Sequence, residues 1–136
     1  MLKPVDLVLS FYSRLGQGDV PALLELLASE LEWTEAERFP YYGGTWRTPQ
    51  AVVDGLLAPI GRDWSAFAAV PERFITEGDQ VVALGAYTGT HRQTQRSFTA
   101  RFAHVWRVRD RKLAGFTQYT DTAKVLEATP RTALGD

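Results

Sequence analysis

Apolar residues recur at helical spacing near the start of the chain. Val5, Val8, Tyr12 and Leu15 follow one another at steps of three and four residues, which places them on one face of a helix. Gly16-Gln17-Gly18 comes next and predicts the end of that helix, because glycine readily adopts the backbone conformation of a helix C-terminus. The chain is therefore expected to begin with an amphipathic helix.

Capping signals predict two more helices. Asp19 is a favourable N-cap, because its carboxylate can accept hydrogen bonds from the free backbone N–H groups of a first turn. Thr48 followed by Pro49 predicts the start of a third helix, with Thr48 as its N-cap and Pro49 in its first turn. This helix is expected to end near Pro59-Ile60-Gly61. The buried side of the second helix is expected to consist of Leu23, Leu24, Leu26 and Leu27.

After Trp64 the pattern changes to an alternation of apolar and polar residues. Four segments separated by short polar turns are predicted to be strands: 66–76, 81–90, 97–109 and 113–120. Their spacing predicts an antiparallel meander. The short aromatic segment 32–35 is expected to be another strand.

Helices followed by a meander predict an α+β fold, with three helices laid across one side of a curved antiparallel sheet. A chain of 136 residues has the usual length of one domain. We expect a single domain over residues 1–128. Residues 129–136 have no periodicity and are expected to be a flexible tail.

Composition narrows the possible partners. The net charge of -1 offers no basic excess for nucleic acid or for an anionic membrane. Cysteine is absent and there are only two histidines, His91 and His104, so neither a metal site nor a cofactor is expected. No secretory signal or membrane-length apolar run is recognisable, and we expect a cytoplasmic protein.

The strand predicted over residues 97–109 has two different faces. Phe102, His104 and Trp106 alternate on one of them, and Gln118 is expected to share that face across the last hairpin. A histidine in such a position either lines a pocket or is a core residue that is hydrogen-bonded to a neighbour.

The chain resembles a known family at three places: Gly18-Asp19-Val20, Phe102-Ala103-His104-Val105-Trp106 and the segment from Phe116 to Thr122. These are similar to the SnoaL-like, ketosteroid-isomerase-related family over residues 4 to about 126. The resemblance implies the nuclear-transport-factor-2-like, cystatin-like fold. In that fold a curved sheet wraps around three helices and forms a cone with one internal pocket for a small molecule.

Alignment with a ketosteroid isomerase at the Gly18-Asp19 turn implies roles for three residues. Glu35 falls at the carboxylate base, His104 at the protonated aspartic acid of the oxyanion hole, and Phe11 at its tyrosine. A phenyl ring cannot donate a hydrogen bond to an enolate, and one such donor is worth about 3 kcal/mol of transition-state stabilisation. The resemblance therefore implies a base beside an incomplete oxyanion hole.

Two other mechanisms of this fold match less well. The arginine and the two aspartates of the related epoxide hydrolases fall on Gly85, Tyr87 and Gln118, so that triad is missing. The histidine and the acid–base aspartate of SnoaL-type polyketide cyclases fall on His104 and Gln118. Gln118 keeps the shape of the acid but has no proton to titrate.

Glu35 is the carboxylate expected to act as a base. Trp33, Phe39 and Tyr87 are expected to surround it and to raise its pKa by desolvation. Ketosteroid isomerase is a known example of an enzyme in which an apolar site raises the pKa of a carboxyl group. The alternative is a surface glutamate paired with Arg38 or Arg47. Glu37, two residues further along, is the second candidate for the same face.

A loop rich in aromatic residues lies between the first strand and the third helix. Tyr41, Tyr42, Trp46 and Trp64 are expected either to form the rim of an apolar site or to close the open end of the cone. The residues expected to bind the ligand are Trp33, Phe39, Tyr41, Tyr42, Tyr87, Phe102, Trp106 and Gln118.

The other face of the strand over residues 97–109 carries Thr99, Arg101, Val105, Arg107 and Arg109. A mixed face on an open sheet is suited to a two-fold interface, and it is equally suited to contact with solvent. We expect a homodimer formed through this outer face.

The leading hypothesis is an enzyme that transfers a proton on a small, apolar, carbonyl-bearing molecule. Glu35 would be the base, and His104 with Gln118 would polarise the carbonyl. The first alternative is a non-catalytic, dimeric ligand-binding domain, and the second is a protein-interaction module. A pocket with a carboxyl of raised pKa favours the enzyme, whereas a pocket with only a neutral histidine favours simple binding.

Overall fold

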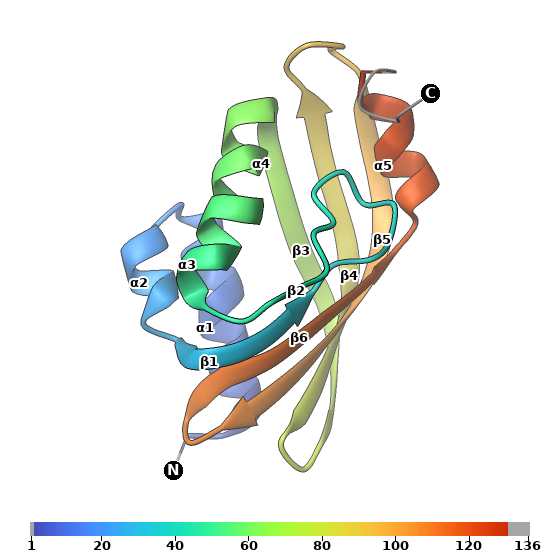
Figure 1. The fold of residues 1–136 in the computed structure, drawn as a ribbon. Helices are drawn as coiled ribbons and strands as arrows, with labels where there is room; N and C mark the ends of the chain where they lie inside the picture. Colours follow the sequence, from blue (N-terminus) through green and yellow to red (C-terminus); the bar gives the residue numbers. More distant parts are fainter. Residues whose placement is uncertain (1, 131–136) are drawn as a thin grey trace.

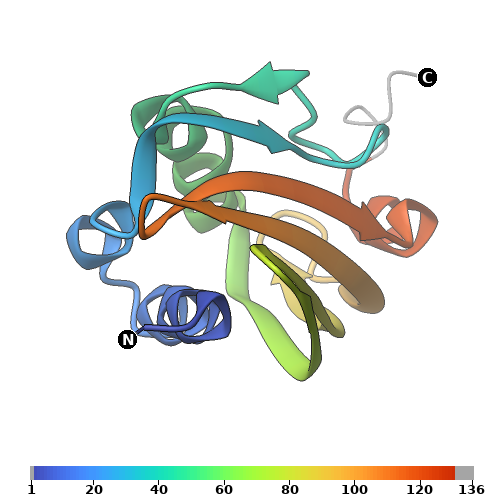
Figure 2. The same ribbon diagram turned by 90° about the horizontal axis from the view of Figure 1, so that it is seen from below.

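Six strands form one curved sheet in the computed structural model of this protein, which describes residues 2–130. The sheet is open, and its concave side holds the helices (Figures 1 and 2). The strands lie in the order β2-β1-β6-β5-β4-β3. Their bounds are β1 (Leu27–Thr34), β2 (Thr45–Trp46), β3 (Trp64–Glu77), β4 (Gln80–His91), β5 (Ser97–Arg109) and β6 (Lys112–Thr120). The predicted α+β class and curved sheet are confirmed.

The predicted meander corresponds to strands β3 to β6, and each neighbouring pair is antiparallel. The turn after β5 shows how local sequence fixes the register. Asp110 and Arg111 both have positive φ, 50° and 63°, as a two-residue hairpin turn of the twisted type requires. Arg109 is thereby placed opposite Lys112.

The first strand differs from the prediction. It begins at Leu27 instead of residue 32, and it runs parallel to β6, so the sheet is not wholly antiparallel. The assignment of Leu26 and Leu27 to the second helix was wrong, because α2 (Val20–Leu24) ends earlier. A short apolar run suits a buried strand as well as a buried helix, and the pairing with β6 decides between them here.

The predicted caps start the helices. Asp19 accepts a hydrogen bond from the N–H of Ala22 (3.1 Å), and Thr48 accepts one from Ala51 (3.2 Å). The first helix, α1 (Pro4–Gly16), agrees with the prediction. A short helix, α5 (Thr122–Ala128), follows the sheet.

The third predicted helix is longer than expected. It runs through α3 (Pro49–Val52), a π-helical turn (Val53–Leu57) and α4 (Ala58–Asp63), which together we call the long helix. Pro59 was expected to end it, because proline has no N–H and its ring clashes with the carbonyl four residues back. The helix nevertheless continues through a wider turn just before the proline, in which the N–H of Ala58 bonds to the carbonyl of Val53, five residues back.

Aromatic rings fill the space between α1 and the sheet. Phe11 of α1 packs 4.7 Å from Trp106 of β5, and Trp33 of β1 stacks 4.0 Å from Phe116 of β6, measured between ring centroids. These residues come from four elements that are far apart in sequence. Their packing holds α1 against the concave face of the sheet (Figure 2).

The end of the described chain is packed on the β4–β5 hairpin. Arg96 donates hydrogen bonds to the carbonyls of Glu127 and Thr129, each at 2.8 Å, and Thr129 is buried. Residues 131–136 of the predicted tail lie outside the described residues. Within residues 2–130, none of the helices combines the length and the apolarity needed to cross a membrane.

The close packing of the long helix on Trp46 makes a prediction. A methyl group added at Gly55 would lie 2.8 Å from Cζ2 of Trp46, so Gly55→Ala should lower the free energy of unfolding by about 1–3 kcal/mol. Gly61→Ala is the control, because no heavy atom lies within 4 Å of the added group. That variant should be as stable as the wild type or more stable, by up to about 1 kcal/mol. Urea unfolding measures both, and equal midpoints for the two variants would contradict this packing.

Candidate functional site

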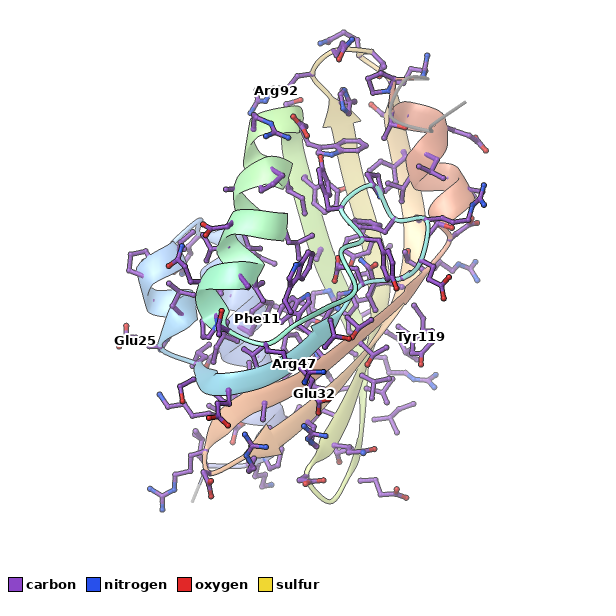
Figure 3. All side chains as sticks on the ribbon, in the orientation of Figure 1. Phe11, Glu25, Glu32, Arg47, Arg92 and Tyr119 are labelled. Carbon is purple, nitrogen blue, oxygen red and sulfur yellow. The ribbon has the colours of Figure 1, made fainter. Side chains whose placement is uncertain are left out.

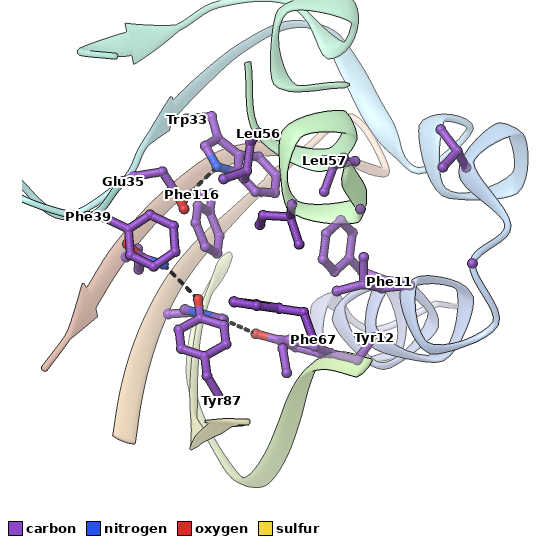
Figure 4. Close-up of a pocket in the computed structure, with 18 residues that line it drawn as sticks. Phe11, Tyr12, Trp33, Glu35, Phe39, Leu56, Leu57, Phe67, Tyr87 and Phe116 are labelled. Carbon is purple, nitrogen blue, oxygen red and sulfur yellow. Dashed lines mark hydrogen bonds between the residues drawn. The ribbon is translucent and has the colours of Figure 1, made fainter. Parts of the chain in front are cut away.

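A cavity of about 250 Å³ lies between the concave face of the sheet, α1 and the long helix (Figure 4). Most of its wall is apolar. The apolar lining comes from Phe11, Leu15, Val20, Trp33, Phe39, Leu56, Leu57, Ile60, Phe67, Ala69 and Phe116. Five side chains bring polar atoms: Tyr12, Glu35, Tyr87, His104 and Gln118.

The cavity opens between the α1–α2 turn and the long helix. Gly18 and Gly61 line it and are also exposed to solvent, so they mark its mouth. Leu57 and Ile60, beside them, make the mouth apolar. The π-helical turn contributes Leu56 and Leu57 to the wall of the cavity.

Glu35 follows β1, whose alternation turns Trp33 and Glu35 to the inside of the cone. The carboxyl is 3% exposed, and its Oε2 accepts a hydrogen bond of 2.9 Å from Nε1 of Trp33. Its other oxygen has no hydrogen-bond partner within residues 2–130. Every fully enclosed polar side-chain atom of these residues has such a partner, so this oxygen is not fully enclosed. That oxygen therefore faces the cavity.

The surroundings of Glu35 favour its neutral form. Burial raises the pKa of its carboxyl from 4.5 to about 8, and the hydrogen bond from Trp33 offsets part of this effect. Glu37 is exposed, and Arg47 pairs with Glu32 at 3.7 Å. Glu35 lines the cavity, whereas Glu37 is not among the residues that line it.

His104 is held by two tyrosines. Its Nδ1 lies 2.5 Å from the hydroxyl of Tyr12, and its Nε2 lies 2.5 Å from the hydroxyl of Tyr87. Its ring also stacks on Phe102, with 3.8 Å between the centroids. Burial lowers the pKa of His104, because the charged imidazolium loses its hydration. The ring is therefore neutral near pH 7.

The tyrosines continue this contact as a chain of hydrogen bonds, which we call the polar chain. Nε1 of Trp106 donates to the hydroxyl of Tyr12 at 3.0 Å. At the other end, Nε2 of Gln118 donates to the hydroxyl of Tyr87 at 2.8 Å, and Oε1 of Gln118 accepts from the backbone N–H of Ala36 at 2.9 Å. The polar chain runs from Trp106 through Tyr12, His104, Tyr87 and Gln118 to Ala36.

The structure brings some of the predicted ligand-binding residues to the cavity and not others. Trp33, Phe39, Tyr87 and Gln118 line it. Phe102 and Trp106 are buried directly behind His104 and Tyr12.

Tyr41 and Tyr42 lie elsewhere, on the loop between β1 and β2. The hydroxyl of Tyr41 donates to Asp63 (2.8 Å) and accepts from Nε1 of Trp64 (2.9 Å). Tyr42 is 45% exposed. Trp64 is buried. Tyr41 thus fastens the loop to the end of the long helix.

Tyr12 is a polar residue of the cavity that was not singled out from the sequence. The alignment directed attention to Phe11, and Tyr12 was counted only as part of an apolar helix face. Both residues line the cavity, and Tyr12 supplies the hydroxyl that Phe11 lacks. A tyrosine on an otherwise apolar face was the available signal, because a buried phenol needs a hydrogen-bond partner.

The described residues contain no group of three or more histidine, aspartate or glutamate side chains arranged to hold a metal ion. The polar side of the cavity consists of one carboxyl, one imidazole, one amide and two phenols. Such groups can transfer a proton and donate hydrogen bonds to an oxygen atom.

Comparison with known proteins gives consistent matches. Residues 8–116 match the model of the SnoaL-like domain. The structure is similar to an NTF2-like protein from Burkholderia thailandensis, with a TM-score of 0.90 and 35% identity over 96% of this chain and 100% of that chain. It is also similar to an NTF2-like protein of unknown function from Burkholderia pseudomallei, with a TM-score of 0.85 and 28% identity over 94% and 98%.

A more distant solved structure shares the fold. TerC, co-crystallised with polyporic acid, has a TM-score of 0.81 and 23% identity over 92% of this chain and 96% of that chain. No curated protein matches the sequence significantly.

The burial of Glu35 predicts a stability difference that grows with pH. Because its pKa in the folded state is about 8 and its ordinary value is 4.5, the folded protein binds more protons than the unfolded chain between these values. Wild-type stability should therefore fall as pH rises through this window, by a few kcal/mol at most. The amide introduced by Glu35→Gln does not ionise, so this variant does not lose stability in this way. The difference between its melting temperature and that of wild type should therefore increase from pH 4.5 to 8.

Glu37→Gln serves as the matched control, because Glu37 is exposed. Its melting temperature should follow that of wild type across the same pH range. A Glu35→Gln protein that also follows wild type would place the carboxyl in contact with bulk water.

Proposed function

The chain belongs to the SnoaL-like domain family, and on this premise we propose that it is an enzyme that transfers a proton on a small, apolar, carbonyl-bearing molecule. The reaction would be an isomerisation, cyclisation or dehydration that needs no cofactor. Glu35 would be the base.

One observation carries this proposal: a carboxyl with a pKa of about 8 opens onto an apolar cavity. A base works best when its pKa lies near the pH at which it operates. A carboxylate in water is too weak a base for a carbon acid, and desolvation makes it stronger. A site that only bound an apolar ligand would gain nothing from such a buried carboxyl, because its burial costs stability.

The cavity also limits the size of the ligand. Its volume of about 250 Å³ lies just below the usual range for drug-sized ligands, about 300–1,000 Å³. A molecule of about two fused rings suits this space. The apolar mouth at Leu57 and Ile60 would hold the hydrocarbon part, and the oxygen would lie among the polar side chains.

His104 and Gln118 would polarise the carbonyl. Both ring nitrogens of His104 are hydrogen-bonded to tyrosine hydroxyls, and both polar atoms of Gln118 have partners. His104 would therefore act on a ligand through Tyr12 and Tyr87, and Gln118 would act through Tyr87 and through the second N–H of its amide. Trp33 and Phe39 would contact its apolar part.

Proton exchange tests the proposed reaction. The protein is incubated in D₂O with 2-acetylnaphthalene, a two-ring ketone with an acidic methyl group, and deuterium uptake is followed by mass spectrometry. The wild type should accelerate uptake, with a rate that rises with pH and levels off above about 8, as Glu35 ionises. Glu35→Gln should reduce the rate by about 10²–10⁴-fold.

Glu37→Gln should retain the wild-type rate, since its side chain lies outside the cavity. Tight binding of the ketone with no acceleration by wild type would instead support the alternative, a non-catalytic ligand-binding domain.

We also propose that the protein is a homodimer formed through the outer face of the sheet. Leu84, Ala103 and Tyr119 lie side by side on β4, β5 and β6, and Val82 and Val105 form the next row. Tyr119 is 59% exposed and points away from the cone (Figure 3). An apolar stripe across three strands is the kind of surface that a second copy would cover.

Ala103→Arg should convert the dimer into a monomer, because it places a charge in the middle of the stripe. Ser13→Arg adds the same charge on the exposed side of α1 and should leave the dimer intact. Light scattering coupled to size-exclusion chromatography gives both masses. A wild-type protein that is monomeric at tens of micromolar would rule out this interface.

A further inference from the structure

The two ends of the polar chain have a fixed direction. The backbone N–H of Ala36 can only donate, so Oε1 of Gln118 must be the acceptor and the amide NH₂ must face Tyr87. At the other end the indole N–H of Trp106 can only donate to Tyr12. Each tyrosine oxygen therefore accepts one hydrogen bond from the end of the chain.

The middle of the polar chain then has one hydrogen too many. Neutral His104 carries one N–H donor and one bare nitrogen that accepts. It accepts the O–H of one tyrosine and donates to the oxygen of the other. The first tyrosine is fully used, whereas the second accepts two hydrogen bonds and keeps a free O–H. This count is the same for both tautomers of His104.

The free O–H has no acceptor among the residues that the structure describes. Within residues 2–130, neither Tyr12 nor Tyr87 has a hydrogen-bonding partner beyond those of the polar chain. Both tyrosines line the cavity, so the free O–H is available there. A shift of the proton between the two nitrogens of His104 moves it from one tyrosine to the other.

We infer that Gln118, by donating to Tyr87 instead of accepting from it, leaves one O–H of the polar chain free, and that Tyr87 donates this O–H to an oxygen atom of the ligand beside Glu35. Tyr87 is the better placed of the two phenols, because Gln118 bonds both to its hydroxyl and to the backbone N–H of Ala36, the residue that follows Glu35. Tyr87 would touch the ligand, and Gln118 and His104 are positioning residues. This inference rests on the proposed function for its ligand class, and it adds Tyr87 as the donor.

A free O–H in the cavity would make the site selective for ligands that accept a hydrogen bond. A ketone oxygen satisfies the free O–H, whereas a hydrocarbon of the same shape displaces water and leaves a buried donor unpaired. Leaving such a donor unpaired weakens binding by roughly tenfold or more. 2-Acetylnaphthalene and 2-isopropenylnaphthalene form a suitable pair, because they differ in replacing C=O by C=CH₂.

Two variants of Gln118 distinguish the effect of the direction of its hydrogen bond to Tyr87 from the effect of its packing. In Gln118→Glu, an ionised carboxylate accepts from both Ala36 and Tyr87, so the hydrogen bond to Tyr87 is reversed. Tyr87 then donates to the carboxylate and accepts from His104, which in turn accepts from Tyr12, and no O–H remains free. In Gln118→Met both polar atoms are lost, yet the count at His104 is unchanged and one O–H stays free.

The measurement is the ratio of the dissociation constants of the alkene and the ketone, from fluorescence titration between about pH 5 and about pH 9. Comparison of this ratio among proteins cancels the different water solubilities of the two compounds. Glu35 is common to all three proteins, so any hydrogen bond that it donates is present throughout. Infrared spectroscopy follows the ionisation of the introduced carboxyl through its own band.

The ratio of the alkene to the ketone dissociation constant should be roughly tenfold higher for wild type and Gln118→Met than for ionised Gln118→Glu. Gln118→Glu should keep the higher ratio while the introduced carboxyl is neutral and lose it when that carboxyl ionises, and the carbonyl band of the bound ketone should return toward its position in an apolar solvent. A preference that survives ionisation, or that Gln118→Met loses equally, would overturn the inference.

The outcome is independent of the proton-transfer reaction. A ketone preference with the predicted response of Gln118→Glu, but without deuterium exchange, would support the hydrogen-bond count and refute catalysis. Exchange that depends on Glu35 without any ketone preference would support catalysis and refute the role of Tyr87.

Discussion

The hydrogen bonds of His104 to two tyrosines are the constraint on which the rest of the site depends. An imidazole in the middle of an aromatic core would cost several kcal/mol if its nitrogens were unpaired. Tyr12 on α1 and Tyr87 on β4 meet this need, and each tyrosine is paired in turn. The position of α1 against the sheet is therefore set by polar geometry as well as by ring packing, and the cavity wall is built from residues that cannot move independently.

Glu35 is in the opposite situation, because its burial is only partly compensated. One oxygen accepts a hydrogen bond from Trp33, and the other faces the cavity. Within the same few ångströms of apolar wall, the fold has satisfied one polar group completely and left another incomplete. Buried polar groups that lack part of their hydrogen bonding are common at functional sites, since a ligand or a proton can supply the missing interaction.

The sequence predicted the fold better than the site, for physical reasons. Alternation along β5 placed His104 inside, and the capping residues Asp19 and Thr48 located two helices, because these signals are local. The continuation of the long helix past Pro59 uses a π-helical turn that no sequence signal had indicated, and the parallel pairing of β1 with β6 depends on contacts between distant segments. Local patterns carry no information about such contacts.

The same reasoning explains why individual site residues were harder to assign. Alignment at the Gly18-Asp19 turn selected Phe11, yet α1 turns both Phe11 and Tyr12 toward the cavity, and only Tyr12 has a hydroxyl. Phe11 packs on Trp106, whereas Tyr12, the next residue of α1, reaches His104 with its hydroxyl. The chemistry of a cone of this kind therefore lies in the directions of its hydrogen bonds, which a single amide such as Gln118 can set without any change of fold.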